Sequence, residues 1–432
     1  MKTERLSIIA NQQKLGSVSY RSDRLDFSYA TAWQTSAESF PLSISMPMAI
    51  RQHPHEVIEP YLWGLLPDSP SVLDLWGKRF HVSPRNVFRL LKHVGEDCAG
   101  AIQFIPEEQE NELRNQLYEE QVQWLSESEL AERIQLVFQN HGVQRVASDQ
   151  GQFSLAGAQP KIALYQSPDT GKWGVPQGVT PTTHILKPAS EHFPGFAENE
   201  HFCLSLASAL GIATARSSVI HTKKISAETE SIPVIVVERY DRLHNGNQFI
   251  RIHQEDFCQA SGIHPNLKYQ SDGGPSVESI ANMIWDVSSN AHLDILTLAD
   301  ALILNFLISG TDAHAKNYSL LLAGGNQVRL APLYDIASTL PYPQTVSPHK
   351  AKLAMKIGSA YQLKKIELRH WDVCAKQLRL PPTQLTDRLR FIAETMQSLA
   401  PATAKQLQNE GLTHPIIQTL AKSIRLRATN FL

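Results

Sequence analysis

The sequence predicts an α+β fold, because segments with strand character and segments with helix character occupy different parts of the chain. The first forty residues alternate in short apolar and polar steps around Gly16, a pattern typical of small antiparallel strands. Strand signals return at residues 154–164, 183–187 and 233–240, whereas the chain is mainly helical beyond about residue 256. With 432 residues and 42% hydrophobic content, the chain can bury a full core and should form two or three domains.

The first region is predicted to be a β-rich N-terminal subdomain over residues 1–106. After the early strands, clustered apolar residues at 61–67 and 87–91 indicate helices. The acidic and polar stretch 107–112 then marks the first boundary.

The second and third regions are predicted to cover residues 107–256 and 257–432. In the second, a Ser-rich start precedes an amphipathic helix at 126–140, and a further helix at 198–210 ends at Gly211. The third is helical apart from a hairpin around the Gly-Gly-Asn turn at 324–326.

The composition excludes several broad classes of function. Lysine and arginine number 40 against 42 acidic residues, so the net charge of -2 provides no general field for nucleic acid or an anionic membrane. The cysteines lie far apart without a C-x-x-C pair, which argues against structural zinc or a disulfide framework and favours small core residues. They are Cys98, Cys203, Cys258 and Cys374.

The hydropathy pattern shows no uninterrupted run of the roughly 18 apolar residues that a membrane helix needs. The most apolar segment, 296–308, is interrupted by Asp300 and Asn305. We therefore expect a cytoplasmic protein without a membrane partner.

A polar heptapeptide, Thr311 to Asn317, directly follows a predicted buried helix that we expect to end at Gly310. Asp312, His314, Lys316 and Asn317 would be costly to desolvate there unless they serve one another or a ligand. A predicted hairpin after them returns the chain to the same place at Asp335.

Two carboxylates and an amide at one place suit phosphoryl transfer. One carboxylate, Asp312, would accept the proton of a hydroxyl, and Asn317 with Asp335 would hold magnesium. Asn317 follows Asp312 by five residues, the Asp-to-Asn spacing of the protein-kinase catalytic loop H-R-D-x-x-x-x-N. The arginine of that motif is missing, and no glycine follows Asp335. The alternative is that Asp312 caps a turn and His314 is a core histidine.

A small-residue stretch, 151–161, could bring backbone N–H groups close to phosphates, although a plain hairpin turn is the alternative. The stretch leads into a strand at 162–164, and the next predicted strand, 183–187, ends at Lys187. This order of loop, strand and lysine strand is the one that a kinase small lobe uses. Glu198 or Glu200, at the start of the next helix, could hold this lysine in place, or both could be surface charges near a helix N-terminus.

The apolar run 234–237 turns polar at Glu238, as expected for a hinge between two lobes. The backbone from Glu238 to Tyr240 could pair with an adenine edge while Tyr240 packs on the ring. The alternative is an interior strand that ends in a salt-bridged turn.

With these segments in order, the chain resembles the HipA family of serine/threonine kinases, the toxins of bacterial HipA–HipB toxin–antitoxin pairs. The resemblance covers nearly the whole chain and rests on matching segments in the expected order. These are 41–47, Leu66-Pro67-Asp68, 94–101, 154–161, 185–188, Glu198-Asn199-Glu200, 238–242, 254–259, 311–317 and 334–338.

The resemblance implies a two-lobed, protein-kinase-like fold with an accessory β-rich subdomain and an all-helical C-terminal domain. It also implies ATP and magnesium as cofactors. Asp312 matches the catalytic base, Asn317 and Asp335 the magnesium ligands, and Glu200 the residue that orients the lysine. The expected ATP-binding residues are Ser154, Leu155, Ala156, Gly157, Ala158, Gln159, Lys161, Lys187, Glu238, Tyr240, Gln254, His314 and Lys316.

Ser154 matches the serine that these kinases autophosphorylate to switch themselves off. A phosphate there adds about -1.5 to -2 charges where the ATP phosphates must approach, which should expel the loop. The family further implies a dimeric helix-turn-helix antitoxin as partner, operator DNA bound mainly through that antitoxin, and glutamyl-tRNA synthetase as one substrate to consider.

Two other classes of function remain as alternatives. A nucleotide-binding pseudokinase would act only as the antitoxin's co-repressor and would bind ATP without turnover. A metal-dependent hydrolase would use Asp312, His314 and Asp335, but this cluster has only one histidine and contains no H-E-x-x-H or H-x-H partner motif.

Overall fold

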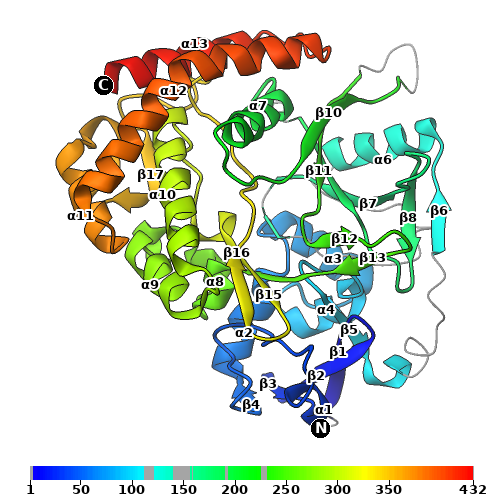
Figure 1. Cartoon of the computed structure of the whole chain (residues 1–432). Helices are drawn as coiled ribbons and strands as arrows, with labels where there is room; N and C mark the ends of the chain where they lie inside the picture. Colours follow the sequence, from blue (N-terminus) through cyan, green and yellow to red (C-terminus); the bar gives the residue numbers. More distant parts are fainter. Residues whose placement is uncertain are drawn as a thin grey trace.

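The computed structural model describes residues 3–110, 121–139, 156–157, 159–189, 193–224 and 231–431. It confirms the predicted α+β class. The β-rich subdomain lies at one end, next to a central lobe built on a six-stranded sheet, and a mainly helical lobe lies beside both (Figure 1).

The N-terminal subdomain, residues 3–110, is built on an antiparallel sheet in the order β4-β3-β2-β1-β5. Apolar side chains alternate toward a core that its helices cover, as the sequence pattern predicted. The strands are β1 (Glu4–Ala10), β2 (Gln13–Arg21), β3 (Arg24–Tyr29), β4 (Gln52–Pro54) and β5 (Ile102–Pro106). The helices are α1 (Thr31–Gln34), α2 (His55–Gly64), α3 (Pro70–Phe80), α4 (Val87–Val94) and the short η1 (Glu107–Gln109).

The central lobe, residues 121–251, contains the six-stranded sheet β10-β11-β9-β7-β8-β6 and a separate hairpin, β12 with β13. Its strands are β6 (Gln121–Trp124), β7 (Ile162–Gln166), β8 (Trp173–Gln177), β9 (His184–Pro188), β10 (Ser217–His221), β11 (Pro233–Glu238), β12 (Arg242–His244) and β13 (Phe249–Arg251). Its helices are α6 (Glu127–Gln139) and α7 (Phe196–Ala209).

Helices cover both faces of this central sheet, which explains the continuous apolar run in β11. Val234 and Val236 pack in the cluster that includes residues of α6, whereas Ile235 and Val237 pack with residues of α7. One boundary differs from the sequence expectation. A strand was expected from 154, but β7 begins at Ile162, and Gly157 makes only an isolated bridge to Pro67.

The C-terminal lobe, residues 253–431, is mainly helical, and the hairpin predicted around 324–326 is confirmed as β15 and β16. The all-helical domain that the resemblance implies is wrong in detail, because β14 joins this hairpin in one small sheet and β17 and β18 form another. Periodicity alone does not distinguish such short apolar segments from helix. The strands are β14 (His253–Asp256), β15 (Ser319–Ala323), β16 (Gln327–Leu330), β17 (Lys352–Ile357) and β18 (Ala360–Gln362). The helices are α8 (Phe257–Ala260), α9 (Val277–Val287), α10 (Ala291–Ile308), α11 (Leu368–Gln377), α12 (Pro382–Asn409) and α13 (Ile416–Phe431). Four short turns of 3-10 helix are η2 (Pro265–Leu267), η3 (Gln270–Asp272), η4 (Ala315–Asn317) and η5 (Leu363–Lys365).

Helix α10 is the central helix of this lobe and leads into the polar heptapeptide. Among the described helices it is the one long and apolar enough to cross a membrane, which corrects the expectation that no segment was. However, 67% of it is buried inside the protein, as in a core helix. Its last turn closes on Ser309, which adopts a left-handed conformation (φ 58°) in place of the expected Gly310. Gly310 is still required, because a Cβ there would lie 2.2 Å from Oδ1 of Asn305.

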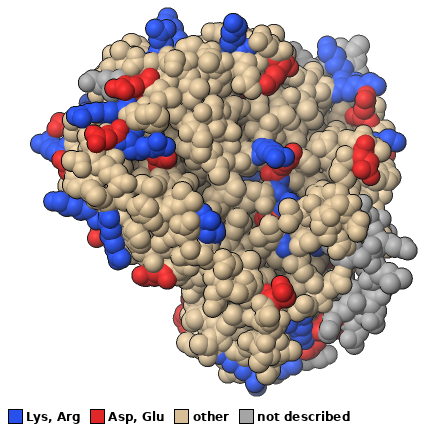
Figure 2. Space-filling view, viewed as in Figure 1, with Lys and Arg blue, Asp and Glu red and all other residues tan. Residues whose placement is uncertain are grey.

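The surface agrees with the near-zero net charge. Figure 2 shows basic and acidic side chains interspersed over the face that it presents. All four cysteines are buried and free, as expected for small core residues.

Candidate active site

Lys187 joins the central lobe to the polar segments of the C-terminal lobe. Its Nζ lies 2.8 Å from Oε1 of Glu200 on α7 and 2.8 Å from Oδ1 of Asp335. The lysine side chain is only 8% exposed. Burial alone would lower the pKa of Lys187, but the carboxylates of Asp335 and Glu200 outweigh it, so the pKa is raised. The lysine therefore stays charged and bridges two carboxylates from different elements.

Asp335 follows β16 and has an uncommon backbone conformation. Its φ is 56°, in the left-handed region that aspartate adopts more readily than most residues. Burial opposes ionisation, but Lys187 and Lys161 outweigh it and hold the pKa of Asp335 below its usual range. Asp335 is therefore an ionised carboxylate that faces two cations.

Helix α7 supplies Glu200 and also holds the chain beyond Asp335. Burial raises the pKa of Glu200 despite the attraction of Lys187. The side chain of Asn199 donates to the carbonyl of Ser338 (2.8 Å) and accepts from its N–H (3.0 Å). Of the two acidic residues expected from the sequence, Glu200 makes the lysine contact, whereas Glu198 is buried beside it on the helix. The Glu-Asn-Glu motif thus fixes both the lysine and the segment that carries Asp335.

Within the heptapeptide, Asp312 lies at the surface and Asn317 lies inside the protein. Nδ2 of Asn317 donates to the backbone carbonyl of Asp312 (3.0 Å), and the hydroxyl of Tyr269 donates to Oδ1 of Asp312 (2.5 Å). Asp312 is exposed, so a second molecule can reach its carboxylate, whereas Asn317 is buried.

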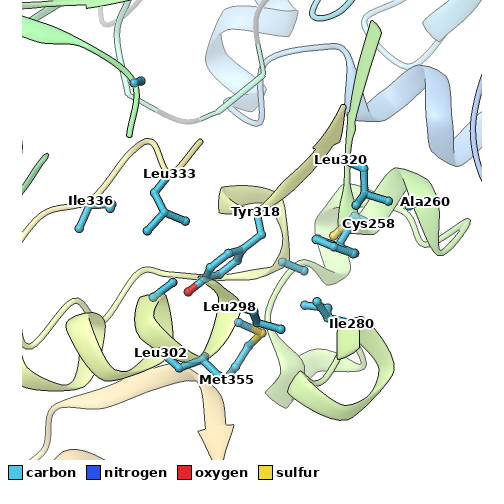
Figure 3. Packing of buried hydrophobic residues seen from close by; sticks show 14 of the residues in the cluster. Cys258, Ala260, Ile280, Leu298, Leu302, Tyr318, Leu320, Leu333, Ile336 and Met355 are labelled. Atoms are coloured by element: carbon cyan, nitrogen blue, oxygen red, sulfur yellow. The ribbon is translucent and has the colours of Figure 1, made fainter. Parts of the chain in front are cut away.

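Core residues hold two polar segments in place, the heptapeptide 311–317 and the segment around Asp335. Tyr318, which follows Asn317, packs among Leu298 and Leu302 of α10, and Leu333 and Ile336 on either side of Asp335 join the same cluster (Figure 3). Such close packing leaves few voids and makes the interior hard to compress, so it restrains the backbone of both segments. The core therefore sets the separation of the two segments.

His314 and Lys316 lie within the same turn but face inward. Burial lowers the pKa of His314 to about 4, so the imidazole is neutral at pH 7. Nζ of Lys316 lies 2.6 Å from Oδ1 of Asp68 in the N-terminal subdomain. In this structure Lys316 is thus neutralised by a protein carboxylate. Its expected contact with ATP remains a prediction.

The expected phosphate loop is only partly described. Ser154, Leu155 and Ala158 lie outside the described residues. Nζ of Lys161 is buried and donates to the carbonyl of Ala156 (2.7 Å), directly below Gly157, where an added Cβ would lie 2.4 Å from that nitrogen. Burial, reinforced by Lys187, lowers the pKa of Lys161 to about 8. The loop thus places a second cation beside Lys187.

Of the two interpretations of the segment after β11, the salt-bridged turn is confirmed, and the adenine-binding hinge stays a prediction. The strand does end in a salt-bridged turn, because Arg239 lies 2.8 Å from Asp241 in a fully buried pair. Glu238 precedes this turn and Tyr240 lies within it, and the Tyr240 hydroxyl binds the side chain of Gln254. Glu238, Tyr240 and Gln254 thus lie at the junction of the two lobes.

The N-terminal subdomain contributes a buried carboxylate to this junction. Asp97 accepts from Arg242 (2.9 Å), Arg251 (3.2 Å) and Arg239 (3.3 Å). Their attraction outweighs burial and holds the pKa of Asp97 well below its usual range. Breaking such a buried network is costly, so the junction should be stiff.

The residues present fit a magnesium site completed by phosphates and water. No cluster of three or more acidic, histidine or cysteine ligands exists among the described residues, as a dedicated protein cage would require. Asn317 donates through its nitrogen, which leaves Oδ1 as a ligand atom, and Asp335 offers an ionised carboxylate. One or two oxygen ligands from the protein are typical of nucleotide-bound magnesium.

Sequence reasoning missed three residues of this site. Tyr269 carries no motif of its own, and only its position beside Asp312 shows its contact. Asp68 and Asp97 lie in segments that resembled the family. Their partners are lysines and arginines far away in the sequence, and nothing in the local sequence around either aspartate indicates these contacts.

Comparison with known proteins supports the resemblance. Family models described as "HipA N-terminal domain" and "HipA-like C-terminal domain" match residues 6–105 and 153–400. "Putative kinase Y4mE" of Sinorhizobium fredii is 36% identical over 389 residues, which cover 89% of this chain and 87% of that protein. "Serine/threonine-protein kinase toxin HipA" of Shewanella oneidensis is 27% identical over 91% of this chain and 87% of that protein.

A solved structure agrees with the fold. The HipA chain from a Shewanella oneidensis complex of HipA, HipB and operator DNA superposes with a TM-score of 0.82 at 24% identity, covering 99% of this chain and 97% of that one. Both family models together span most of the chain, and each contains part of the site described above. The chain therefore belongs to the HipA family.

Proposed function

We propose that this protein is a magnesium- and ATP-dependent serine/threonine protein kinase, the toxin of a HipA–HipB-type module. The observation that carries the proposal is the position of Lys187, which lies 2.8 Å from both Glu200 and Asp335. A lysine held by a helix glutamate beside the metal-binding aspartate is the arrangement that protein kinases require for phosphoryl transfer.

The residues divide the work between holding the nucleotide and activating the hydroxyl. Lys187 and Lys161 would bind phosphates, and the backbone at Glu238 and Tyr240 would bind the adenine edge. Asp335 and Asn317 would hold magnesium, which neutralises charge on the transferring phosphate. With Asp335 engaged as a magnesium ligand, Glu200 would hold Lys187 in place.

Asp312 would act on the substrate side. Its exposed carboxylate can orient a serine hydroxyl and accept its proton, since Tyr269 occupies only Oδ1. Because the Asp312 backbone carbonyl accepts from Asn317, the base and the metal ligand are held in one turn.

Regulation and partners follow from the family. We propose Ser154 as the autophosphorylation site, a helix-turn-helix antitoxin dimer of the HipB type as partner, and operator DNA bound mainly through that antitoxin. Glutamyl-tRNA synthetase is the substrate to test first, and the proposed location is the cytoplasm.

Incubation with magnesium and γ-labelled ATP tests this function. The protein should label itself on Ser154, and the label should disappear when EDTA removes magnesium. ATP binding without any transfer, to itself or to glutamyl-tRNA synthetase, would contradict the kinase and favour the pseudokinase co-repressor. Co-expression with an adjacent helix-turn-helix protein should give a complex that binds operator DNA.

A further inference from the structure

Asp68, in the turn between α2 and α3 of the N-terminal subdomain, reaches into the candidate active site. Its Oδ1 lies 2.6 Å from Nζ of Lys316, and its Oδ2 lies 2.8 Å from Nζ of Lys268. The three side chains are 11%, 4% and 16% exposed, respectively. One carboxylate therefore pairs with two lysines of the C-terminal lobe where water is largely excluded.

The first pair fixes the turn that carries the metal ligand. Lys316 lies in η4, directly before Asn317. The side chain of Asn317 in turn donates to the backbone carbonyl of Asp312 (3.0 Å). Asp68 is thus linked through Lys316 and Asn317 to the backbone of the proposed catalytic base.

The second pair reaches the carboxylate of the same base. Lys268 directly precedes Tyr269, whose hydroxyl donates to Oδ1 of Asp312 (2.5 Å). The carbonyl of Lys268 also accepts from the N–H of Ala315 in η4 (3.3 Å), which joins the two routes. Asp68 thus restrains both the backbone and the carboxylate of Asp312.

Asp68 also touches the phosphate loop. Its N–H donates to the carbonyl of Gly157 (3.3 Å), whose neighbour Ala156 accepts from Lys161. Burial opposes the charge on Asp68, but Lys316 and Lys268 outweigh it and lower the pKa of this carboxyl to about 2. Buried ion pairs often add little net stability, and their best-attested use is to fix one arrangement of the chain.

We propose that Asp68 is a positioning residue for phosphoryl transfer, through which the N-terminal subdomain aligns Asp312 and Asn317. The proposal rests on the kinase function above. It assigns to the accessory subdomain a part in catalysis, because neither lobe of the kinase fold supplies this carboxylate. We assign ATP binding mainly to Lys187, Lys161, Asp335 and the hinge, so Asp68 should affect kcat far more than nucleotide affinity.

The test compares Asp68→Asn with Asp74→Asn, an exposed aspartate of the same subdomain on α3. Misplacement of a catalytic group by about 1 Å can cost about 100-fold in rate. We expect Asp68→Asn to lower kcat about 10- to 100-fold and to leave the Kd for ATP within about threefold. Asp68→Glu should recover part of kcat, whereas Asp74→Asn should match the wild type.

A second variant separates positioning from simple charge balance. The double variant Asp68→Asn/Lys268→Gln removes one negative and one positive charge. In this variant Lys316 is the one lysine of the pair that remains and lacks the Asp68 carboxylate, and the protein should still fold. Its kcat should stay as low as that of Asp68→Asn. Recovery of kcat in this variant would overturn the proposal.

Hydrogen exchange gives a readout that does not depend on activity. Amides of residues 311–318 should exchange faster in Asp68→Asn than in the wild type and Asp74→Asn. Unchanged exchange would refute the role of Asp68 even if the wild type transferred no phosphate. If the wild type transferred no phosphate but exchange in Asp68→Asn were still faster, the positioning role of Asp68 would stand and the proposed kinase reaction would be rejected.

Discussion

The pH dependence of ATP binding should report the charge of Lys161. Its ammonium is buried against the carbonyl of Ala156 at 2.7 Å, and no ion pair of Lys161 exists among the described residues. Burial and the nearby Lys187 lower the pKa of Lys161 to about 8. Below pH 8 the free protein therefore carries this charge, and above pH 8 it progressively loses it.

The sign and size of the effect follow from this pKa. Phosphate oxygens favour the charged lysine, so the bound state has the higher pKa and the neutral lysine must regain a proton to bind. Each pH unit above 8 therefore costs about 1.4 kcal/mol, a tenfold weaker affinity, until the pKa of the bound state is reached. The Kd for ATP should rise by no more than about twofold from pH 7 to 8 and by up to about 30-fold at pH 9.5.

Titration calorimetry of magnesium-ATP between pH 7 and 9.5 measures this directly. Phosphates with a last pKa of about 6 stay ionised over this range and do not contribute. Lys161→Met should bind weakly with a flat pH profile, and the exposed Lys172→Met should follow the wild type. A wild-type Kd that stays within twofold up to pH 9.5, or an unchanged slope in Lys161→Met, would refute the assignment.

Three further changes test other parts of the account. Glu200→Gln removes one charged partner of Lys187, an interaction worth about 1.5–3 kcal/mol, and should lower kcat about 10- to 150-fold in steady-state assays; a kcat equal to the wild type would show that Asp335 alone holds the lysine. Asp335→Asn should make ATP affinity insensitive to magnesium, which calorimetry with and without EDTA would check, and a preserved magnesium effect would reject Asp335 as ligand. Asp97→Ala leaves three buried arginines without their shared carboxylate, so the free energy of unfolding should fall by about 3–5 kcal/mol in urea titrations. A loss below about 1 kcal/mol would mean that the arginines find other partners.

Local patterns predicted much of the fold and of the site. The buried helix α10, the polar heptapeptide after it and the hairpin that leads to Asp335 follow from periodicity and turn residues over short distances. The order of loop, strand and lysine placed Lys187 on β9, and Glu200, one of the two glutamates expected as its partner, makes the contact. Each of these features depends on residues close together in the sequence, and sequence patterns can therefore predict them.

Contacts between distant segments could not be predicted in the same way. Asp68 lies 248 residues from Lys316, and Asp97 lies 142 residues from Arg239. Periodicity assigns a residue to a face but not to a partner on another element. The turn after β11 shows the same limit, since its charges fitted a hinge and a salt-bridged turn equally well. The structure contains the salt-bridged turn, and adenine binding there stays a prediction.

The central claim is that Asp312 is the base of a phosphoryl-transfer site. The most direct measurement is the rate of γ-phosphate transfer by wild type and Asp312→Ala, with ATP affinity measured on both proteins. General base catalysis contributes about 10²- to 10⁴-fold, so Asp312→Ala should lose at least about 100-fold in rate while its Kd for ATP stays within about threefold. A variant that transfers phosphate within threefold of the wild-type rate would contradict the account.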